Sequence, residues 1–300
     1  MNRLAGLYGV MAVLGLCWGL GIPMGKAAVS TGFHPFAVVA WQSIYMAIFL
    51  TVILVLTRGR FPLARRHWGL YLAVAVFGTL IPNTTSYTAA AHLPAGVMAI
   101  VIAMVPMFSL PIAIGLGMER WQWHRASGLI LGAIAVILLA GPETALPEGT
   151  ALVFLALALV APFFYGIEGN WLAHFGTGGL SPLEVLWGAS VLGVLVSVPW
   201  ALASGNWIPV SVSWDAARWA ILVSSITHGI AYTGYVWLVG QAGSVFSAQV
   251  SYLVTAAGVL WSVTLLGERY GGAVWLAFVL MMVGVALVQP RDTTPTADQA

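Results

Sequence analysis

The sequence predicts an all-α polytopic membrane protein, with ten transmembrane helices arranged as two inverted five-helix repeats. Three observations lead to this prediction: the composition, the length of the apolar segments and an internal repeat. Apolar residues make up 60% of the 300 residues and charged residues only 7%, whereas soluble domains carry roughly 25% charged residues. A water-soluble fold cannot hide so much apolar surface, so we expect lipid to cover most of it.

The apolar residues fall into segments of about 20 residues, which is the length of an α-helix that crosses a bilayer. Each segment must be helical because lipid offers no hydrogen-bond partners to free backbone groups. The first segment is uncharged from Leu4 to Gly25, longer than the apolar core of a signal peptide, so we expect it to stay in the protein. In order, the expected spans are 5–26, 34–57, 68–91, 95–118, 124–141, 149–173, 182–203, 216–239, 243–266 and 271–289.

The internal repeat is clearest in the segments Ala95–Arg120 and Ala242–Arg269, which both open on Ala-Gly and close on Glu-Arg. Their Glu-Arg pairs lie 149 positions apart (268 − 119), about half the chain length. Trp18 and Tyr165, each followed by glycine, lie 147 positions apart (165 − 18). A repeat at half the chain length indicates an architecture of two similar units.

The repeat divides the chain into a first five-helix unit at 1–145, a second at 146–290 and a disordered cytoplasmic tail at 291–300. Because each unit holds an odd number of spans, the second must cross the membrane in the opposite sense, as in inverted-repeat transporters. Basic residues favour the cytoplasmic side, and most of them fall on the side of both termini: Arg3, Arg58, Arg60, Arg65, Arg66, Arg120, Arg125 and Arg291.

Two local signals refine the expected helices. Pro106 and Pro111 interrupt the fourth span, because proline cannot donate a backbone hydrogen bond, and they predict kinks there. Ser181-Pro182-Leu183-Glu184 has the pattern of a capping box with proline at the first helical position, which predicts a helix start and a structural role for Glu184.

The motifs together resemble the EamA-type branch of the drug/metabolite transporter superfamily. They are ten spans in two halves, an early Trp-Gly at Trp18, and spans four and nine that close on Gly-x-Glu-Arg at 117–120 and Gly-Glu-Arg at 267–269. The resemblance covers about residues 8 to 289. It implies a bacterial inner-membrane carrier of small organic metabolites, commonly an exporter of amino acids or related compounds, with a central cavity between spans one, three, four, six, eight and nine.

Ionisable groups within a span are functional candidates, because a charge at the bilayer centre costs at least about 2.5–3.5 kcal/mol. Glu168, in span six beside Gly166 and Gly169, is the first candidate. One interpretation is a residue of the substrate site that faces the cavity, either as a cation or proton site or as a gate residue. The other is a carboxylate near the interface, solvated or paired with His174 or Arg120.

Polar side chains also share faces of spans eight and three. His228, Tyr232 and Tyr235 follow the spacing i, i+4 and i+7, so they line one stripe of span eight. Asn83 and Tyr87 lie at i and i+4 in span three. We expect both groups to line the substrate cavity; the alternative for span eight is a neutral histidine bonded to a serine or threonine, with the tyrosines in a helix contact.

Further candidates for the cavity are Gln249 and Tyr252, at i and i+3 in span nine, and Trp18, which lies too deep in span one for an interfacial aromatic belt. We expect the hydroxyl groups of span three to bond the backbone of their own helix. These are Thr84, Thr85 and Thr88.

Several classes of protein are disfavoured by the same sequence. The single Cys17 excludes a disulfide framework, and no clustered His, Asp or Glu indicates a metal or cofactor site. The sequence has no phosphate loop, nucleophile elbow or HExxH motif. A net charge of +2 does not suggest nucleic acid. We therefore expect a protein that is not an enzyme, with a small-molecule substrate and the lipid bilayer as partners and a proton as candidate coupling ion.

These features predict a secondary transporter of small organic metabolites, working as an exporter of amino acids or related, including aromatic, compounds. The alternatives are an uptake carrier or facilitated exchanger of the same fold and, more remotely, a channel, a sensor or an intramembrane enzyme. The sequence leaves the cargo, the coupling ion and the oligomeric state (monomer or homodimer) open.

Overall fold

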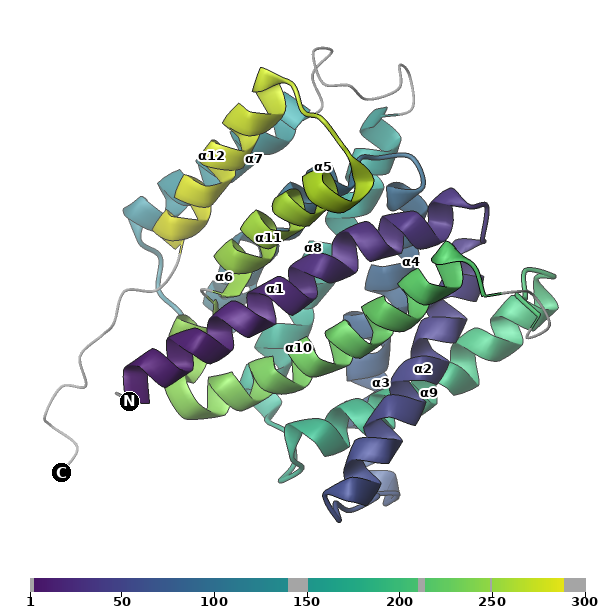
Figure 1. Ribbon diagram of the computed structural model, residues 1–300. Coiled ribbons are helices and arrows are strands. Elements are labelled where there is room, and N and C mark those ends of the chain that lie inside the picture. The colour runs from purple at the N-terminus through teal and green to yellow at the C-terminus, as the bar shows by residue number, and fades with distance from the viewer. Residues whose placement is uncertain (1–2, 140–150, 210–213, 249, 289–300) are drawn as a thin grey trace, which may run out of the picture.

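A computed structural model describes residues 3–139, 151–209, 214–248 and 250–288, and within these ranges the chain forms helices and no strand (Figure 1). The expected tail at 291–300 lies outside them. The elements in order are α1 (Arg3–Ser30), α2 (Pro35–Leu56), η1 (Arg65–His67), α3 (Trp68–Ala75), η2 (Val76–Leu80), α4 (Ile81–Ala90), α5 (Ala95–Ile102), α6 (Val105–Gly115), α7 (Trp123–Leu139), α8 (Ala151–Phe175), α9 (Pro182–Ala203), α10 (Ala216–Ala248), α11 (Val250–Leu266) and α12 (Gly272–Val288).

The helices have the length and surface of membrane-spanning segments. Five helical segments of the described chain are long and apolar enough to cross a bilayer: Ala5–Ser30, Pro35–Leu56, Ala95–Gly115, Leu152–Phe175 and Pro182–Ala203. α7, α11 and most of α12 form shorter apolar helices. Large apolar side chains point outward on several helices, as at Leu56, Ile137 and Leu195, which are 76%, 68% and 62% exposed. This all-helical architecture is that of a polytopic membrane protein.

Each segment expected to span the membrane coincides with a helix or a run of helices, with differences at three places. The fourth segment divides into α5 and α6, so the prolines act earlier than expected. Pro106 lacks the N–H that would bond to Ile102, and the helix is interrupted at Ala103 and Met104, just before it. The third segment contains a π-helical turn, η2, which has no signal in the sequence.

The third difference lies at the end of the eighth segment. α10 continues to Ala248, beyond the expected end at 239, and α11 begins at Val250. The expected start of the ninth span at 243 is therefore wrong. The segment 242–269 matches 95–120 in sequence, but its first residues extend α10, whereas Ala95 begins α5.

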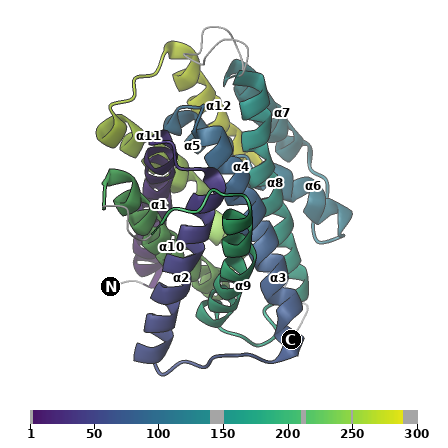
Figure 2. The ribbon, with the colours of Figure 1, turned by 90° about the vertical axis from the view of Figure 1, so that its right-hand side faces the viewer.

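The packing of the helices has the same pattern when the two halves are exchanged. α1 of the first half packs on α10 and α11 of the second, and α8 of the second half packs on α4 and α6 of the first. α7 pairs with α12 and α2 pairs with α9, as Figures 1 and 2 show. Most of the extensive contacts therefore join one half of the chain to the other.

The predicted capping box at the start of α9 is confirmed. The Ser181 hydroxyl accepts from the Glu184 backbone N–H at 3.3 Å, and the Glu184 carboxylate accepts from the Ser181 N–H at 2.8 Å. Pro182 occupies the first helical position. Glu184 is structural, as the sequence indicated.

Glycine allows the close approach of α1 to α11. A Cβ added at Gly19 would lie 2.6 Å from the Cβ of Ala257 and 2.8 Å from the backbone nitrogen of Gly258. Such contacts are shorter than real Cβ atoms tolerate, so the two backbones meet here only because Gly19 has no side chain. Gly21, on another side of α1, faces open space.

We predict that Gly19→Val destabilises the protein by about 1–3 kcal/mol, because the added methyl groups force α1 away from α11. Gly21→Val is the matched control, since the same change there meets nothing within 4 Å. Thermal unfolding of the purified variants in detergent measures both. Equal melting temperatures for the two variants would contradict a close α1–α11 contact.

Candidate functional site

A group of aromatic and polar side chains meets where α1, α8 and α10 come together. The Trp18 ring of α1 lies 6.2 Å from the His228 ring, 6.1 Å from the Tyr232 ring and 5.5 Å from the Tyr235 ring, all three on α10. The indole N–H of Trp18 donates to Nδ1 of His228 at 3.2 Å. The predicted stripe of span eight thus faces the deep tryptophan of span one.

Glu168 of α8 joins this group through a hydrogen bond from the Tyr232 hydroxyl to its Oε1. The carboxyl is buried, with 5% of Glu168 exposed, so it is enclosed by protein and not solvated. Its partner is Tyr232, and not His174 or Arg120 as one interpretation of the sequence proposed. Buried carboxylates in a membrane protein that are bonded in this way are typical of substrate and ion pathways.

Gly78 makes room for the Glu168 carboxyl. A Cβ at Gly78 would collide with Oε1 and lie 2.6 Å from Cδ of Glu168. Gly78 is the central residue of the π-helical turn η2, between α3 and α4. π-helical turns frequently mark functional sites, because the extra residue re-aims the helix surface. Here the turn and the glycine together admit a carboxyl group from α8.

A second chain of hydrogen bonds continues from α8 to α4 and α2. The Tyr165 hydroxyl donates to Oδ1 of Asn83 at 3.2 Å, and Nδ2 of Asn83 donates to Oε1 of Gln42 at 2.8 Å. Tyr87, one turn along α4 from Asn83, is buried and its ring faces Gly25 of α1. The amide of Asn83 thus has partners on both sides.

The donors Trp18 and Tyr165, one in each chain of hydrogen bonds, are equivalent in the internal repeat, under the offset of 147 positions (165 − 18). Each donates to a residue of the opposite half: Trp18 to His228 in α10, and Tyr165 to Asn83 in α4.

These bonds and ring contacts form two sets, which we call together the central cluster. The first set is Trp18, Glu168, His228, Tyr232 and Tyr235, and the second is Gln42, Asn83 and Tyr165.

Three predicted site residues are not in this cluster. Tyr87 lies beside it, one turn along α4 from Asn83. Tyr252 of α11 is half-buried and packs against an apolar core. Gln249 lies outside the residues that the structure describes.

Sequence reasoning missed three residues of the central arrangement. Gln42 is a buried amide in an otherwise apolar span, and that isolation was a usable signal. Tyr165 was found only as the repeat partner of Trp18, although this equivalence itself pointed to the site. Gly78 carries no local signal, because its role depends on a side chain 90 positions away (168 − 78).

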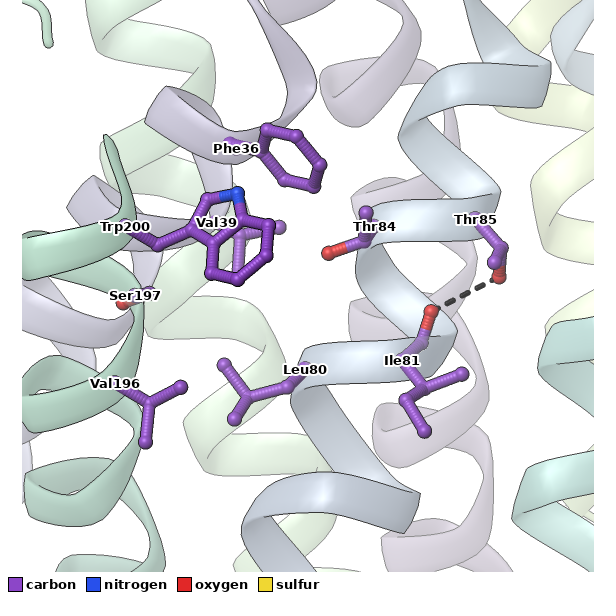
Figure 3. Close-up of a pocket in the computed structure, with 9 residues that line it drawn as sticks. All are labelled: Phe36, Val39, Leu80, Ile81, Thr84, Thr85, Val196, Ser197 and Trp200. Atoms are coloured by element: carbon purple, nitrogen blue, oxygen red, sulfur yellow. Dashed lines mark hydrogen bonds between the residues drawn. The ribbon is translucent and has the colours of Figure 1, made fainter. Parts of the chain in front are cut away.

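The hydroxyl groups of α4 behave as predicted at two positions of three. Thr85 donates to the carbonyl of Ile81 at 3.0 Å, and Thr88 donates to the carbonyl of Thr84 at 2.7 Å. The side chain of Thr84 instead points into a groove between α2, η2–α4 and α9 (Figure 3). The prediction for Thr84 is not borne out by this geometry.

The groove has a volume of about 380 Å³ and a mainly apolar lining. It contains no residue of the central cluster, and it lies beside lipid-facing side chains such as Val196 and Trp200, which are 47% and 59% exposed. Its lining residues, drawn in Figure 3, are Phe36, Val39, Leu80, Ile81, Thr84, Thr85, Val196, Ser197 and Trp200.

A buried polar cluster assembled from both halves of an apolar helical chain is the construction of a membrane transport protein. The sequence pattern of the EamA-like transporter family matches residues 7–141 and 152–289. The chain belongs to this family, which confirms the resemblance found in the sequence.

Similar proteins agree with this assignment. A probable terminal-alkyne amino-acid exporter of Streptantibioticus cattleyicolor is 27% identical over 211 residues, which is 68% of this chain and 69% of that protein. The uncharacterized inner membrane transporter YedA of Escherichia coli K12 is 23% identical over 300 residues, covering 96% of this chain and 92% of its own. One crystal structure has the same fold, with a TM-score of 0.67 at 16% identity over 94% of this chain and 97% of that one.

We predict that Gly78→Ala displaces the Glu168 carboxyl from Tyr232 and destabilises the protein by about 1–3 kcal/mol, the usual cost of losing a buried hydrogen bond to such a group. Gly69→Ala in α3 is the matched control, because a Cβ there meets nothing within 4 Å. Thermal unfolding of both variants tests this. A Gly78→Ala protein as stable as the Gly69→Ala protein would show that the close contact is not real.

Proposed function

We propose that the protein is a secondary transporter that moves amino acids or related small compounds, aromatic ones included, across the bacterial inner membrane as an exporter. The observation that carries this proposal is the central cluster, in which a buried carboxyl, an imidazole and several aromatic rings from both halves meet between apolar helices. Membership of the EamA-like family and the similarity to an amino-acid exporter support it.

For the architecture we propose ten transmembrane helices in two inverted repeats, at 1–145 and 146–290, with both termini in the cytoplasm. Two features support this. The family pattern matches once in each half, at 7–141 and 152–289. The helix contacts keep their pattern when the halves are exchanged.

For the site we propose that the cargo binds at the central cluster and between the faces of α1, α4, α8, α10 and α11 around it. We propose that Glu168 takes up the coupling proton. Its carboxyl is buried inside a span and accepts a hydrogen bond from Tyr232 of α10. The remaining proposed substrate contacts are Trp18, Asn83, Tyr87, His228, Tyr232, Tyr235, Gln249 and Tyr252.

We predict that Glu168→Gln abolishes transport driven by a pH gradient and leaves exchange without a gradient measurable. The amide keeps the shape of the side chain and can accept from Tyr232, but it cannot carry the proton. Counterflow and gradient-driven flux of labelled amino acids in proteoliposomes separate the two activities. Glu184→Gln is the control, because glutamine serves equally in a capping box.

Three results would contradict this proposal at different levels. Gradient-driven flux that is equal in the wild type and in Glu168→Gln would remove Glu168 from the coupling step. Absence of counterflow for every metabolite tested would argue against a carrier and favour a channel or a sensor. Net accumulation of a metabolite in the direction of uptake would favour an uptake carrier of the same fold.

A further inference from the structure

The proton of the His228 ring has a determined position in the central cluster. The indole nitrogen of Trp18 can only donate a hydrogen bond, and it lies 3.2 Å from Nδ1 of His228. Nδ1 must therefore be the acceptor, so the imidazole is neutral and its proton is on Nε2. The bond from α1 thus selects one tautomer of the histidine.

The Nε2–H of His228 has no hydrogen-bond partner although the atom is buried. Orphaned donors of this kind are uncommon in native protein interiors, and each asks for an explanation. Of the neighbouring polar groups, Tyr232 donates to Glu168, and Asn83 bonds Tyr165 and Gln42. The hydroxyls of Thr233 and Thr255 are also unpaired, but a hydroxyl both donates and accepts and so selects no particular ligand group.

We propose that the Nε2–H of His228 is the group that orients the cargo, by donating to a carboxylate or carbonyl oxygen, while the rings of Trp18, Tyr232 and Tyr235 contact the apolar or aromatic body of the cargo. This inference rests on the proposed transport function and narrows its substrate class. The site takes compounds with a hydrogen-bond acceptor beside an aromatic or apolar group, and it discriminates against compounds that offer only donors, such as amines.

Three probes that share one phenyl ring test this selection: 3-phenylpropionate, 3-phenylpropionamide and 3-phenylpropylamine. We expect the purified protein to bind the first two about tenfold more tightly than the amine, as measured by thermal stabilisation, because only they accept from Nε2–H. His228→Phe should weaken binding of the two acceptor probes about tenfold and leave the amine unchanged. His228→Gln, whose amide can accept from Trp18 and donate to the cargo, should retain most of the selection.

The test can fail in ways that differ from failure of the transport proposal. Equal binding of the amine and the acceptor probes, or undiminished binding by His228→Phe, overturns the inference. So does the absence of binding by all three probes. Counterflow of other metabolites in the same preparation would then show that transport survives and only the assigned selection is wrong.

A second, independent observation concerns Glu268, which follows α11 and bonds a helix of the first half. Its Oε1 accepts from the Ala95 N–H at 2.9 Å and its Oε2 from the Gly96 N–H at 3.2 Å, so the carboxylate caps the N-terminus of α5. The Tyr270 hydroxyl bonds both Glu268 and Ser262. Burial raises the pKa of Tyr270 well above its usual value, which keeps this hydroxyl protonated as a donor to the carboxylate.

The repeat equivalent of this cap is not formed. Ala242 and Gly243 correspond to Ala95 and Gly96 at the offset of 147 positions (242 − 95), and Glu119 corresponds to Glu268. Ala242 and Gly243 lie inside the continuous helix α10, so their N–H groups belong to a helix interior and not to a helix start. Glu119 instead bonds Arg125 of its own half, at 2.9 Å.

We infer that the two caps alternate during transport. In the conformation described here, Glu268 holds α5 at one end of the protein. In the exchanged conformation α10 is interrupted before Ala242, Glu119 leaves Arg125 to cap the new helix start, and Glu268 releases α5. Inverted repeats alternate access by exchanging the arrangements of their halves, and here each arrangement has its own carboxylate cap.

The accessibility of a cysteine at position 98, one turn into α5, reports on this cap. In a Cys17→Ser, Met98→Cys background in detergent, Glu268→Gln should raise the labelling rate with a water-soluble maleimide several-fold, because α5 loses its cap. Glu184→Gln, in the capping box of α9, is the control and should leave the rate unchanged. A rate unaffected by Glu268→Gln, or raised equally by Glu184→Gln, overturns the inference; transport assays on the same variants are scored separately.

Discussion

The interior of this protein depends on one constraint: a polar side chain inside a membrane must find its partner within the chain. In the central cluster two of the four hydrogen bonds join opposite halves, and the other two lie within one half. Trp18 of the first half bonds His228 of the second, and Tyr165 of the second half bonds Asn83 of the first. Because lipid supplies no hydrophobic force between helices, such bonds and close packing are what hold the halves together. The polar centre is therefore a structural joint between the halves, in addition to the binding role that we propose for it.

The joint needs space as well as bonds, and glycine supplies it in two ways. Gly19 lets α1 lie directly on α11, so that the backbone brings Trp18 to the centre. Gly78, in the π-helical turn, leaves a place for the carboxyl of Glu168. A larger residue at either position would separate groups that must meet. Small residues at these positions matter as much to the site as the residues that carry its chemistry.

Much of the fold could be predicted because its signals are local or periodic. The apolar segments coincide with helices, and the capping box at Ser181 forms as its residues indicate. The stripe of His228, Tyr232 and Tyr235 follows from helical spacing alone. The partner of Glu168 could not be predicted in this way, because a hydrogen bond between α8 and α10 depends on how the helices pack and not on their patterns. The continuation of α10 past 239 was missed for a different reason. The repeat suggested that Ala242-Gly243 begins a helix as Ala95-Gly96 does, but the second pair has no proline before it to end the preceding helix.

The two halves differ in whether a proline precedes the Ala-Gly pair. Where the first half has Pro94 and a break before Ala95, the second half has Gln241 within a continuous helix. A helix that lacks a proline at this point can either continue or break, whereas the first half must break, because proline restricts the residue before it and cannot donate to the preceding turn. A helix start at Ala242 therefore costs more free energy than one at Ala95, although the two segments are similar in sequence. The α5 end keeps a permanent helix start for Glu268 to cap, and the α10 end must create one at the cost of helical hydrogen bonds. For the alternating caps that we propose, the conformation capped by Glu268 is then the resting state, and the free energy that favours the other conformation has to come from binding at the proposed site in the central cluster.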